Sequence, residues 1–568
     1  MYLHTESRET TTLDGTWQAI PDPYRSFQDG WFDDRDVPLL EDPHEPADYD
    51  VDDGFPVEVP GCVGEQLPGF EYYEGMVWHT RRFDREDNGN RLFLRFGAVN
   101  YEADVWLNGE HLLTHEGGYT PFSVEITDAV SREDNLLVVG VDNERREDGI
   151  PGMQTDWFNF GGIFRSVDLV ATPETFVRNV KVETSVDETV TASITAWIDG
   201  PEPGDVHAAI PGLGAEAPLE PDDSDGALTR LTGEITADRD DVELWHPDGP
   251  RLYDVCVESE SDAVEVRTGF RAVDVEGSDI LVNGESIDVR GISMHEEAAG
   301  RGRALTPGDI DQRFEWVAEL GCNFVRLAHY PHTAAMARRA DEEGILLWEE
   351  VPAYWDIDFA DEGVQALYRQ QLRELIQRDW NRPSVALWSI ANETDPEDEV
   401  RNRVLPEMVA HVRELDDTRL VTAACWFDET DDGLVLLDPL VEHLDVVGIN
   451  EYYGWYGGEA DGVRSFVDDP TGPPVIVSET GAGAKWGNHG DEDDRWTEEF
   501  QAAYYRESLE AIESVEQIVG TTPWILFDFK SPRRMNPHQR GYNRKGLLDE
   551  HGRKKRAFSV LRDHYCDP

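Results

Sequence analysis

The sequence predicts a multidomain chain of β and α/β type, in which two β-sandwiches precede a (β/α)8 TIM barrel. Three observations support this prediction. Residues 1–172 are short alternating apolar and polar runs separated by turn residues, and residues 173–272 repeat this texture on a smaller scale. Residues 273–568 instead alternate short apolar strands with long helical patterns. A length of 568 residues is sufficient for several separate cores.

The first segment is expected to be a jelly-roll β-sandwich, an architecture that often binds sugars. Its runs RLFLRFG (91–97), ADVWLNG (103–109) and NLLVVGVDN (135–143) alternate with Gly, Asn and Asp turn signals. Asn108-Gly109 closes one run and is a strong signal for a tight hairpin.

The second segment is expected to be an immunoglobulin-like β-sandwich. Its length of about 100 residues and its alternating strands suit that fold. The Pro-, Gly- and Asp-rich stretch 211–226 predicts an exposed connection.

The third segment contains eight apolar runs that alternate with helical patterns, and eight such strand-then-helix units in roughly 290 residues are expected of a (β/α)8 barrel. The runs are SIDVRGISM, NFVRLAH, ILLWEEVP, VALWSIANE, RLVTAAC, DVVGINEYY, PVIVSE and TPWILFDF. Helical patterns such as DIDQRFEWVAELG and TAAMARRADEEG lie between them.

Net charge is the most unusual property of the composition. The formal charge is -69, from 118 acidic and 49 basic residues, and only six of the basic residues are Lys. A surface this anionic repels nucleic acid and anionic membranes, so neither is an expected partner. Dispersed acidity with few lysines resembles proteins of extreme halophiles, and this resemblance implies a haloarchaeal source.

Cysteine usage and the N-terminus bear on location and cofactors. Five widely spaced cysteines without a CxxC pair argue against a disulfide framework or a structural zinc site. No run approaches the ~20 apolar residues of a membrane span, and no signal peptide begins the chain. We therefore expect a cytoplasmic protein without a metal or other cofactor.

Barrel geometry directs attention to polar residues at the carboxyl ends of the strands, where active sites of this fold lie. These residues are His295, Glu296, Arg326, His329, Glu349, Glu350, Asn392, Glu393, Asn450, Tyr452, Tyr453, Glu479 and Asp528. Glu393 ends the fourth run and Glu479 the seventh, and two carboxyls facing one another are what glycoside hydrolysis with retention needs. Each acid taken singly could also cap a loop or pair with Arg.

Five motifs carry a resemblance to glycoside hydrolase family 2, the group of β-galactosidases, β-mannosidases and β-glucuronidases. They are RGISMHE (290–296), NFVRLAHYPH (323–332), WSIANET (388–394), INEYYGWY (449–456) and VSETGA (477–482). The resemblance runs nearly end to end. It implies that Glu393 is the acid/base and Glu479 the nucleophile of a retaining, exo-acting glycosidase.

The same resemblance suggests residues that bind substrate. Arg326 and Tyr452 are expected beside Glu479, where a guanidinium and a phenol favour its ionised form. Asn392 is expected to bond the sugar 2-hydroxyl, and the remaining candidates at the barrel mouth are His295, His329 and Trp524. One departure from the family pattern is Thr480, which replaces an aromatic residue.

Two further matches favour a uronic acid. GYNRKG (541–546) resembles the Asn-x-Lys pair of β-glucuronidases, which implies that Asn543 and Lys545 grip a sugar carboxylate. TDWFNFGGIFRSV (155–167) resembles the jelly-roll loop that brings Asp156 to the sugar hydroxyls. Arg540 and Tyr456 are weaker candidates for the carboxylate pocket, and the SPRR segment (531–534) departs from the familiar pattern.

The expected function is therefore hydrolysis of terminal β-linked sugars of a carbohydrate or glycoconjugate, with β-D-glucuronides preferred. β-Galactosidase or β-galacturonidase activity is the alternative, and a non-catalytic carbohydrate-binding protein is a more distant one. A metal-dependent hydrolase is disfavoured because His295-Glu296-Glu297 lacks HExxH spacing. A homodimer or homotetramer is expected by analogy with the family.

Overall fold

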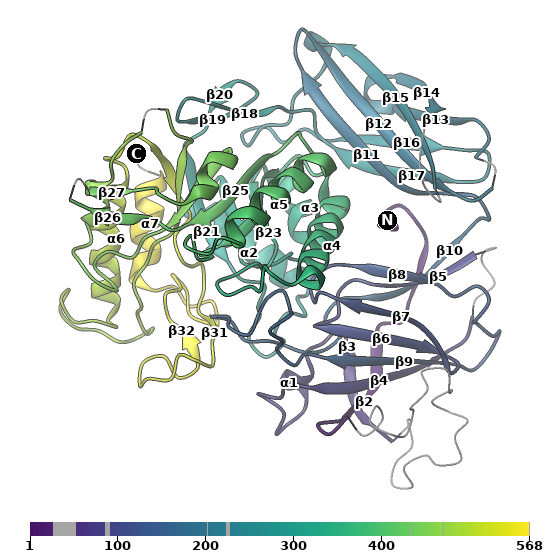
Figure 1. The fold of residues 1–568 in the computed structure, drawn as a ribbon, viewed down its shortest axis with the longest axis horizontal. Coiled ribbons are helices and arrows are strands. Elements are labelled where there is room, and N and C mark those ends of the chain that lie inside the picture. The colour runs from purple at the N-terminus through teal and green to yellow at the C-terminus, as the bar shows by residue number, and fades with distance from the viewer. Residues whose placement is uncertain are drawn as a thin grey trace.

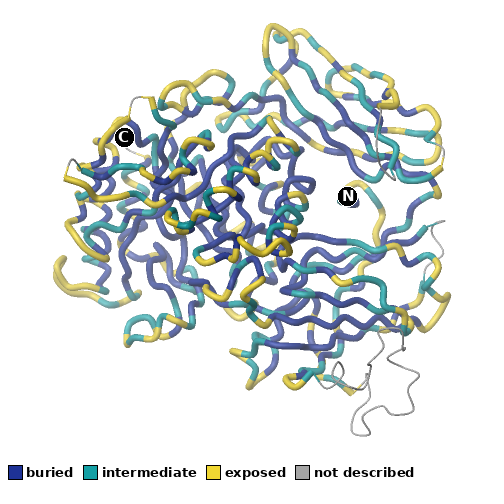
Figure 2. Tube along the Cα trace, in the orientation of Figure 1, coloured by how far each residue is buried: buried dark blue, intermediate teal, exposed yellow. Residues whose placement is uncertain are grey.

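The structure is a computed structural model and describes residues 1–25, 53–85, 91–201, 203–222, 228–431, 433–469 and 471–566. Two β-sandwiches flank one side of a closed barrel, and the N-terminus lies between the sandwiches (Figure 1). Buried residues form a continuous interior through the barrel, while the outer loops are exposed (Figure 2). The predicted fold class is confirmed.

The N-terminal sandwich consists of two antiparallel sheets. The smaller sheet has the order β1 (Thr10–Thr12), β10 (Val167–Thr172), β5 (Arg91–Phe96), β8 (Phe122–Glu125). The larger sheet has the order β3 (Phe55–Val59), β2 (Gly15–Pro21), β4 (Met76–Phe83), β9 (Asn135–Asp142), β6 (Glu102–Leu107), β7 (Glu110–Glu116). A short helix, α1 (Val63–Gln66), joins β3 to β4. The β6–β7 turn has φ of 53° at Asn108 and 85° at Gly109, the positive pair that a type I′ hairpin requires.

The second sandwich is built from seven antiparallel strands. Their order is β11 (Phe176–Val186), β12 (Thr189–Asp199), β15 (Thr229–Asp238), β14 (Ala215–Pro221), β13 (Val206–Ile210), β16 (Tyr253–Glu258), β17 (Ala263–Thr268), with short 3-10 turns η1 (Pro211–Leu213) and η2 (Arg239–Asp241). The expectation of an exposed connection over 211–226 was wrong for its first part. β14 pairs with β13 and β15, because AEAPLE has the period of a strand and buries Leu219.

A small three-stranded sheet follows, formed by β18 (Val273–Glu276), β19 (Asp279–Val282) and β20 (Glu285–Ser286). Its apolar residues Val273, Ile280 and Val282 belong to one buried cluster with Phe324 and Leu346, which begin barrel strands. The sheet therefore covers the amino end of the barrel and leaves the carboxyl end for the site.

Eight parallel strands close the barrel. They are β21 (Val289–Met294), β22 (Phe324–Leu327), β23 (Leu346–Glu350), β24 (Val385–Asn392), β25 (Leu420–Cys425), β28 (Val446–Asn450), β29 (Val475–Glu479) and β30 (Ile518–Thr521). The helices are α2 (Pro307–Leu320), α3 (Ala334–Glu343), α4 (Glu362–Asp379), α5 (Arg401–Leu415), α6 (Glu498–Ile512) and α7 (Arg556–Cys566). Local sequence signals mark the ends of these helices. For example, α2 begins with a Thr306/Asp309 capping box and Pro307, and it ends at Gly321, which has a left-handed backbone.

Two features of the barrel differ from the sequence prediction. β25 and β28 are followed by 3-10 turns, η3 (Pro439–His443) and η4 (Gly462–Ser465), instead of α-helices, because these loops are rich in Gly, Asp and Pro. A hairpin, β26 (Asp428–Thr430) and β27 (Gly433–Val435), precedes η3.

The eighth strand is 518–521 and not the predicted run 522–529. The regular strand ends at Thr521, because Pro523 cannot donate to a ladder, although residues 522–526 still bond to the segments of β21 and β29. Trp524 and Phe529 are apolar because they pack with jelly-roll residues such as Trp157 and Phe158 over the barrel mouth. Further along this segment, β31 (Phe529–Lys530) and β32 (Tyr542–Asn543) form a two-stranded sheet. No helix in the described ranges is long and apolar enough to cross a membrane.

Candidate active site

A cavity of about 930 Å³ opens at the carboxyl ends of the barrel strands. Barrel loops form most of its wall, and the jelly-roll contributes one acidic side chain. The expected site residues that line the cavity are Asp156, Glu393, Tyr452, Tyr456, Glu479, Trp524 and Lys545. The two candidate catalytic acids therefore share one cavity.

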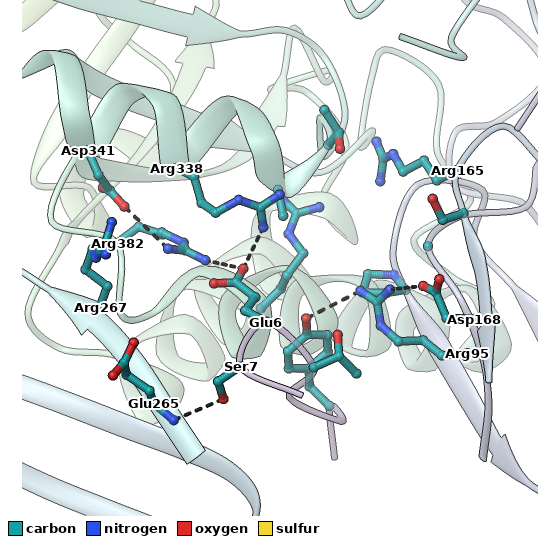
Figure 3. Close-up of a pocket in the computed structure, with 18 of the residues that line it drawn as sticks. Glu6, Ser7, Arg95, Arg165, Asp168, Glu265, Arg267, Arg338, Asp341 and Arg382 are labelled. Atoms are coloured by element: carbon teal, nitrogen blue, oxygen red, sulfur yellow. Dashed lines mark hydrogen bonds and ion pairs between the residues drawn. The ribbon is translucent and has the colours of Figure 1, made fainter. Parts of the chain in front are cut away.

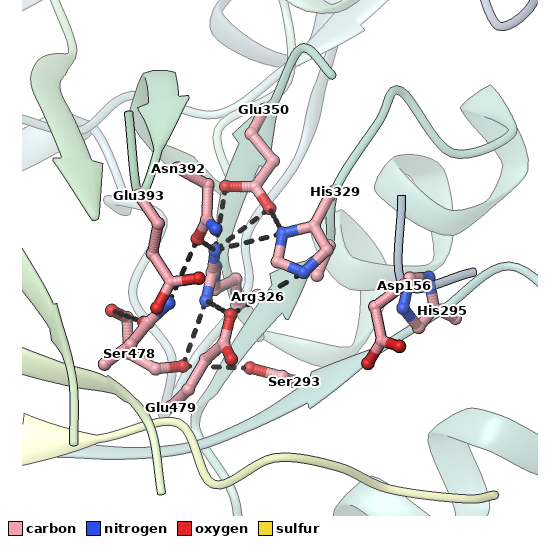
Figure 4. Close-up of polar contacts among 12 residues, drawn as sticks. Asp156, Ser293, His295, Arg326, His329, Glu350, Asn392, Glu393, Ser478 and Glu479 are labelled. Atoms are coloured by element: carbon pink, nitrogen blue, oxygen red, sulfur yellow. Dashed lines mark hydrogen bonds and ion pairs between the residues drawn. The ribbon is translucent and has the colours of Figure 1, made fainter. Parts of the chain in front are cut away.

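Glu479 is the last residue of β29, and its carboxylate lies against Arg326 (Figure 4). Arg326 Nη1 donates to its Oε1 at 3.0 Å, and the Tyr452 hydroxyl donates to its Oε2 at 2.6 Å. The side chain is only 6% exposed. Burial raises the pKa of Glu479 to about 7 with help from nearby Glu393, although Arg326 and Tyr452 lower it. Arg326 and Tyr452 lie beside Glu479 as expected, but burial outweighs their effect on its pKa.

Arg326 connects the nucleophile candidate to the neighbouring strands. Its Nη2 donates to Asn392 Oδ1 at 2.6 Å and to Glu350 Oε1 at 3.2 Å. Glu350 in turn lies 2.9 Å from His329 Nδ1 and accepts from Trp348 Nε1 at 3.0 Å. Asn392 Oδ1 is engaged by Arg326, while the buried Asn392 Nδ2 has no hydrogen-bond partner in the described structure.

Glu393 begins the loop after β24 and adopts a left-handed conformation, with φ of 50°. Such a backbone is uncommon for a residue other than glycine and is concentrated at functional sites. Trp355, also left-handed with φ of 55°, donates from Nε1 to Glu393 Oε2 at 2.8 Å. The second oxygen, Oε1, accepts no hydrogen bond in the described structure and remains free to act on a substrate.

The rings of His295, His329 and Trp524 contact one another in an aromatic cluster. The His329 ring stacks on Trp524 with centroids 4.8 Å apart, and the His295 ring lies 4.2 Å from that of Phe529. Burial lowers the pKa of His329 to about 4 and that of His295 well below its usual value, so both rings are neutral at neutral pH. His295 Nδ1 lies 2.9 Å from the Tyr330 hydroxyl.

The segment after β30 brings two cations to the same cavity. Lys545 Nζ donates to the Tyr456 hydroxyl at 2.7 Å and lies 4.4 Å from the Tyr452 ring centroid. Arg534 forms a bidentate pair with Asp156, at 2.8 Å from Nε and 2.6 Å from Nη2. Asn543 Nδ2 also donates to Asp156, at 2.9 Å.

Arg540 was wrongly expected in this pocket. It is exposed, does not line the cavity and donates from Nε to the Pro537 carbonyl at 3.2 Å. The turn at Arg540, with φ of 50°, directs the chain elsewhere. Arg534 lines the cavity, although it was not among the expected residues. It belongs to the SPRR segment, whose departure from the family pattern was the available signal.

Sequence reasoning also missed Trp355 and Tyr354, although both directly follow the third strand and line the cavity. Thr480, the other departure, does not face the cavity. It is fully buried, and its hydroxyl donates to Glu451 Oε1 at 2.6 Å behind β29. A sugar contact from this position is therefore absent from the described arrangement.

A closed parallel barrel whose mouth holds two carboxylates on separate strands, one clamped by Arg and Tyr, is the arrangement of a glycoside hydrolase. The residues described contain no group of three His, Cys, Asp or Glu side chains placed to hold a metal ion.

The chain belongs to glycosyl hydrolases family 2. The TIM barrel domain of that family matches residues 273–567, its sugar binding domain matches 12–173, and a third family model matches 175–271. The protein is therefore a glycoside hydrolase enzyme.

Similar proteins span the whole chain. A β-glucuronidase of Paenibacillus borealis is 27% identical over 618 aligned positions, covering 99% of this chain and 97% of the relative. The structure of Bifidobacterium dentium β-glucuronidase complexed with coumarin-3-O-glucuronide has a TM-score of 0.86 at 25% identity, covering 100% and 98% of the two chains. A β-galacturonidase of Eisenbergiella tayi bound to galacturonate shares the fold, with a TM-score of 0.83 at 24% identity and coverage of 100% and 99%.

Proposed function

We propose that this enzyme removes terminal β-D-glucuronic acid from glycoconjugates with retention of configuration. The observation that carries the proposal is one cavity in which Glu393 and the Arg326-clamped Glu479 face a wall bearing Lys545 and Arg534. The carboxyl pair supplies the chemistry, and the two cations supply the means of recognising a uronate.

The reaction proceeds in two displacements. The Glu479 carboxylate attacks the anomeric carbon while Glu393 gives its proton to the glycosidic oxygen, so the bond to the leaving group breaks and a glycosyl ester forms. Glu393, now a carboxylate, then takes a proton from water as that water attacks the same carbon. The ester bond breaks, the sugar leaves with its original configuration, and both side chains return to their starting states.

Recognition of the sugar carboxylate is assigned to Lys545, with Asn543 and Arg534 beside it. Lys545 is buried, and its ammonium donates to the Tyr456 hydroxyl and forms no ion pair with an acid in the part of the chain that the structure describes. Arg534 is already paired with Asp156, which leaves Lys545 as the less neutralised cation. The β-glucuronidase relatives named above are consistent with this assignment.

The test is a kinetic comparison of nitrophenyl β-glucuronide, β-galacturonide and β-galactoside in molar salt. We expect glucuronide to be preferred, and Lys545→Ala to reduce kcat/KM on it by about 10- to 100-fold while changing the galactoside rate far less. Lys554→Ala, which removes a lysine paired with Glu319 on the surface, is the matched control.

If galacturonide is the preferred substrate and Lys545→Ala lowers its kcat/KM by the same factor, the assignment of the uronate site stands and the preferred sugar is galacturonic acid. Preference for galactoside, or equal loss on all substrates in Lys545→Ala, would overturn the assignment. Binding without hydrolysis of any β-glycoside would instead indicate a carbohydrate-binding protein.

A further inference from the structure

The cations and the exposed acids that line the active cavity come from different segments of the chain. Both lining cations, Arg534 and Lys545, belong to the segment after β30. In the barrel order β24-β25-β28-β29-β30, that strand lies four steps from β24, directly across the eight-stranded barrel.

The opposite wall is acidic. The loops after β23, β24 and β25 contribute five exposed lining carboxylates: Asp356, Asp395, Glu397, Asp428 and Glu429. Within the described structure, no hydrogen bond or ion pair joins any of them to a basic side chain. Arg533 approaches this side, with its guanidinium 4.9 Å from the Trp355 ring centroid, but it does not line the cavity.

The acidic wall also carries an aromatic surface. Trp426 is 47% exposed, an unusual state for so large an apolar side chain, and it lies beside Phe427 at the start of the hairpin that bears Asp428 and Glu429. Exposed aromatic rings at a cavity wall are favourable contacts for flat apolar faces.

The position of Glu393 decides which part of a substrate meets this wall. Glu393 follows β24, between the loops that carry the acids, and is the group that protonates the glycosidic oxygen in the proposed function. The leaving group must therefore project to the acidic and aromatic side, while the uronate points to the cations across the barrel.

We infer that this wall selects leaving groups that present a flat apolar face and carry no negative charge. The inference rests on the proposed function for its assignment of Glu393. An aryl ring and the apolar face of a neutral sugar both satisfy this chemistry, whereas a second uronic acid or a sulfated group meets Asp428 and Glu429 as a like charge.

The experiment measures kcat/KM for matched pairs of leaving groups on the same sugar. One pair is nitrophenyl against carboxynitrophenyl β-glucuronide, and the other is glucuronosyl-glucose against glucuronosyl-glucuronate. We expect the uncharged member of each pair to be preferred by about tenfold. The double variant Asp428→Asn/Glu429→Gln is expected to reduce that preference by about threefold or more.

The matched control is Asp187→Asn/Glu188→Gln, which removes the same charge from an exposed hairpin turn of the second sandwich. It is expected to leave the preference unchanged. Trp426→Ala is expected to raise KM for uncharged leaving groups by about tenfold, and the pair more affected, aryl or sugar, identifies the source.

Equal rates on charged and uncharged leaving groups, or an unchanged preference in Asp428→Asn/Glu429→Gln, would overturn the inference. If another sugar proves to be the preferred glycone, the proposed function fails by that comparison alone, and the leaving-group ratio measured on that sugar decides the inference separately. Absence of hydrolysis on every glycoside would overturn both.

Discussion

Glu479 is subject to two opposing influences. Burial disfavours its charged form, whereas Arg326 and Tyr452 favour it, and the net effect places its pKa at about 7. Attack on an anomeric carbon requires the ionised carboxylate, so the balance between these influences sets the pH range in which the enzyme works.

The acidic limb of the pH profile follows from this balance. Because Glu479 must lose its proton, kcat/KM is expected to fall as pH drops below about 7 in the wild type. Tyr452→Phe removes a hydrogen bond to the charged form, which raises the pKa of Glu479 and moves the limb upward by about one unit. Tyr453→Phe, at a neighbouring ring that also lines the cavity without contacting Glu479, should leave the limb in place. A limb that does not move in Tyr452→Phe would contradict this account, and Glu479→Gln should be inactive at all pH values.

At the scale of elements, the N-terminal segment joins parts of the chain that are remote in sequence. Glu6 lies in a second cavity, of about 490 Å³, lined by residues of both sandwiches and the barrel (Figure 3). Its carboxylate accepts from Arg338 at 2.7 Å and from Arg382, two residues of the barrel. Although burial raises it, these two arginines lower the pKa of Glu6 to about 2.

This contact has a predictable pH dependence. The pKa of Glu6 is about 2 in the folded protein and ordinarily 4.5, so its stabilising effect is present above pH 4.5 and is lost as pH falls towards 2. The shift corresponds to at most about 3 kcal/mol, less for the part of Glu6 that solvent reaches. We expect Glu6→Gln to lower the unfolding temperature at pH 7, to lower it less at pH 3, and to have little effect near pH 2, measured by calorimetry. Glu9→Gln is the control, because Glu9 is an exposed acid of the same segment. An equal loss of stability at pH 7 and near pH 2 would indicate packing, not charge.

At the scale of the whole molecule, the charge of -69 must be accommodated by a folded chain. Like charges on a compact surface repel one another, and unfolding relieves that repulsion. At molar ionic strength the Debye length is about 3 Å, so most of the repulsion is screened. We propose that the enzyme is adapted to such conditions.

Salt should therefore stabilise the protein strongly. We expect the unfolding temperature to rise by on the order of 10 °C between 0.1 M and 2 M KCl, as followed by circular dichroism. Sucrose at matched osmolality is the control, because it is excluded from protein surfaces without screening charge. An unfolding temperature that responds equally to sucrose and KCl would remove the basis for salt adaptation.

Much of the fold was predictable because the spacing of apolar residues along a short stretch of sequence indicates whether that stretch is a strand or a helix. Alternation with period two identified the sandwiches, and apolar runs between helical patterns identified the barrel. The errors arose where local composition misleads. In the run 522–529, Leu526 and Phe527 pack in the barrel core while Trp524 and Phe529 pack with the jelly-roll, so its apolar character does not mark a strand. Residues 215–221 contain two prolines yet form β14.

The sequence by itself determined that Glu393 and Glu479 would share a site, since the carboxyl ends of all strands in a parallel barrel meet at one face. Only the tertiary structure decided their surroundings. The Trp355 bond to Glu393 and the Arg534 pair with Asp156, 378 positions apart, depend on loop conformation and domain packing. Periodicity carries information about which face a residue occupies, but the direction of a side chain in a loop is set by contacts that are distant in sequence.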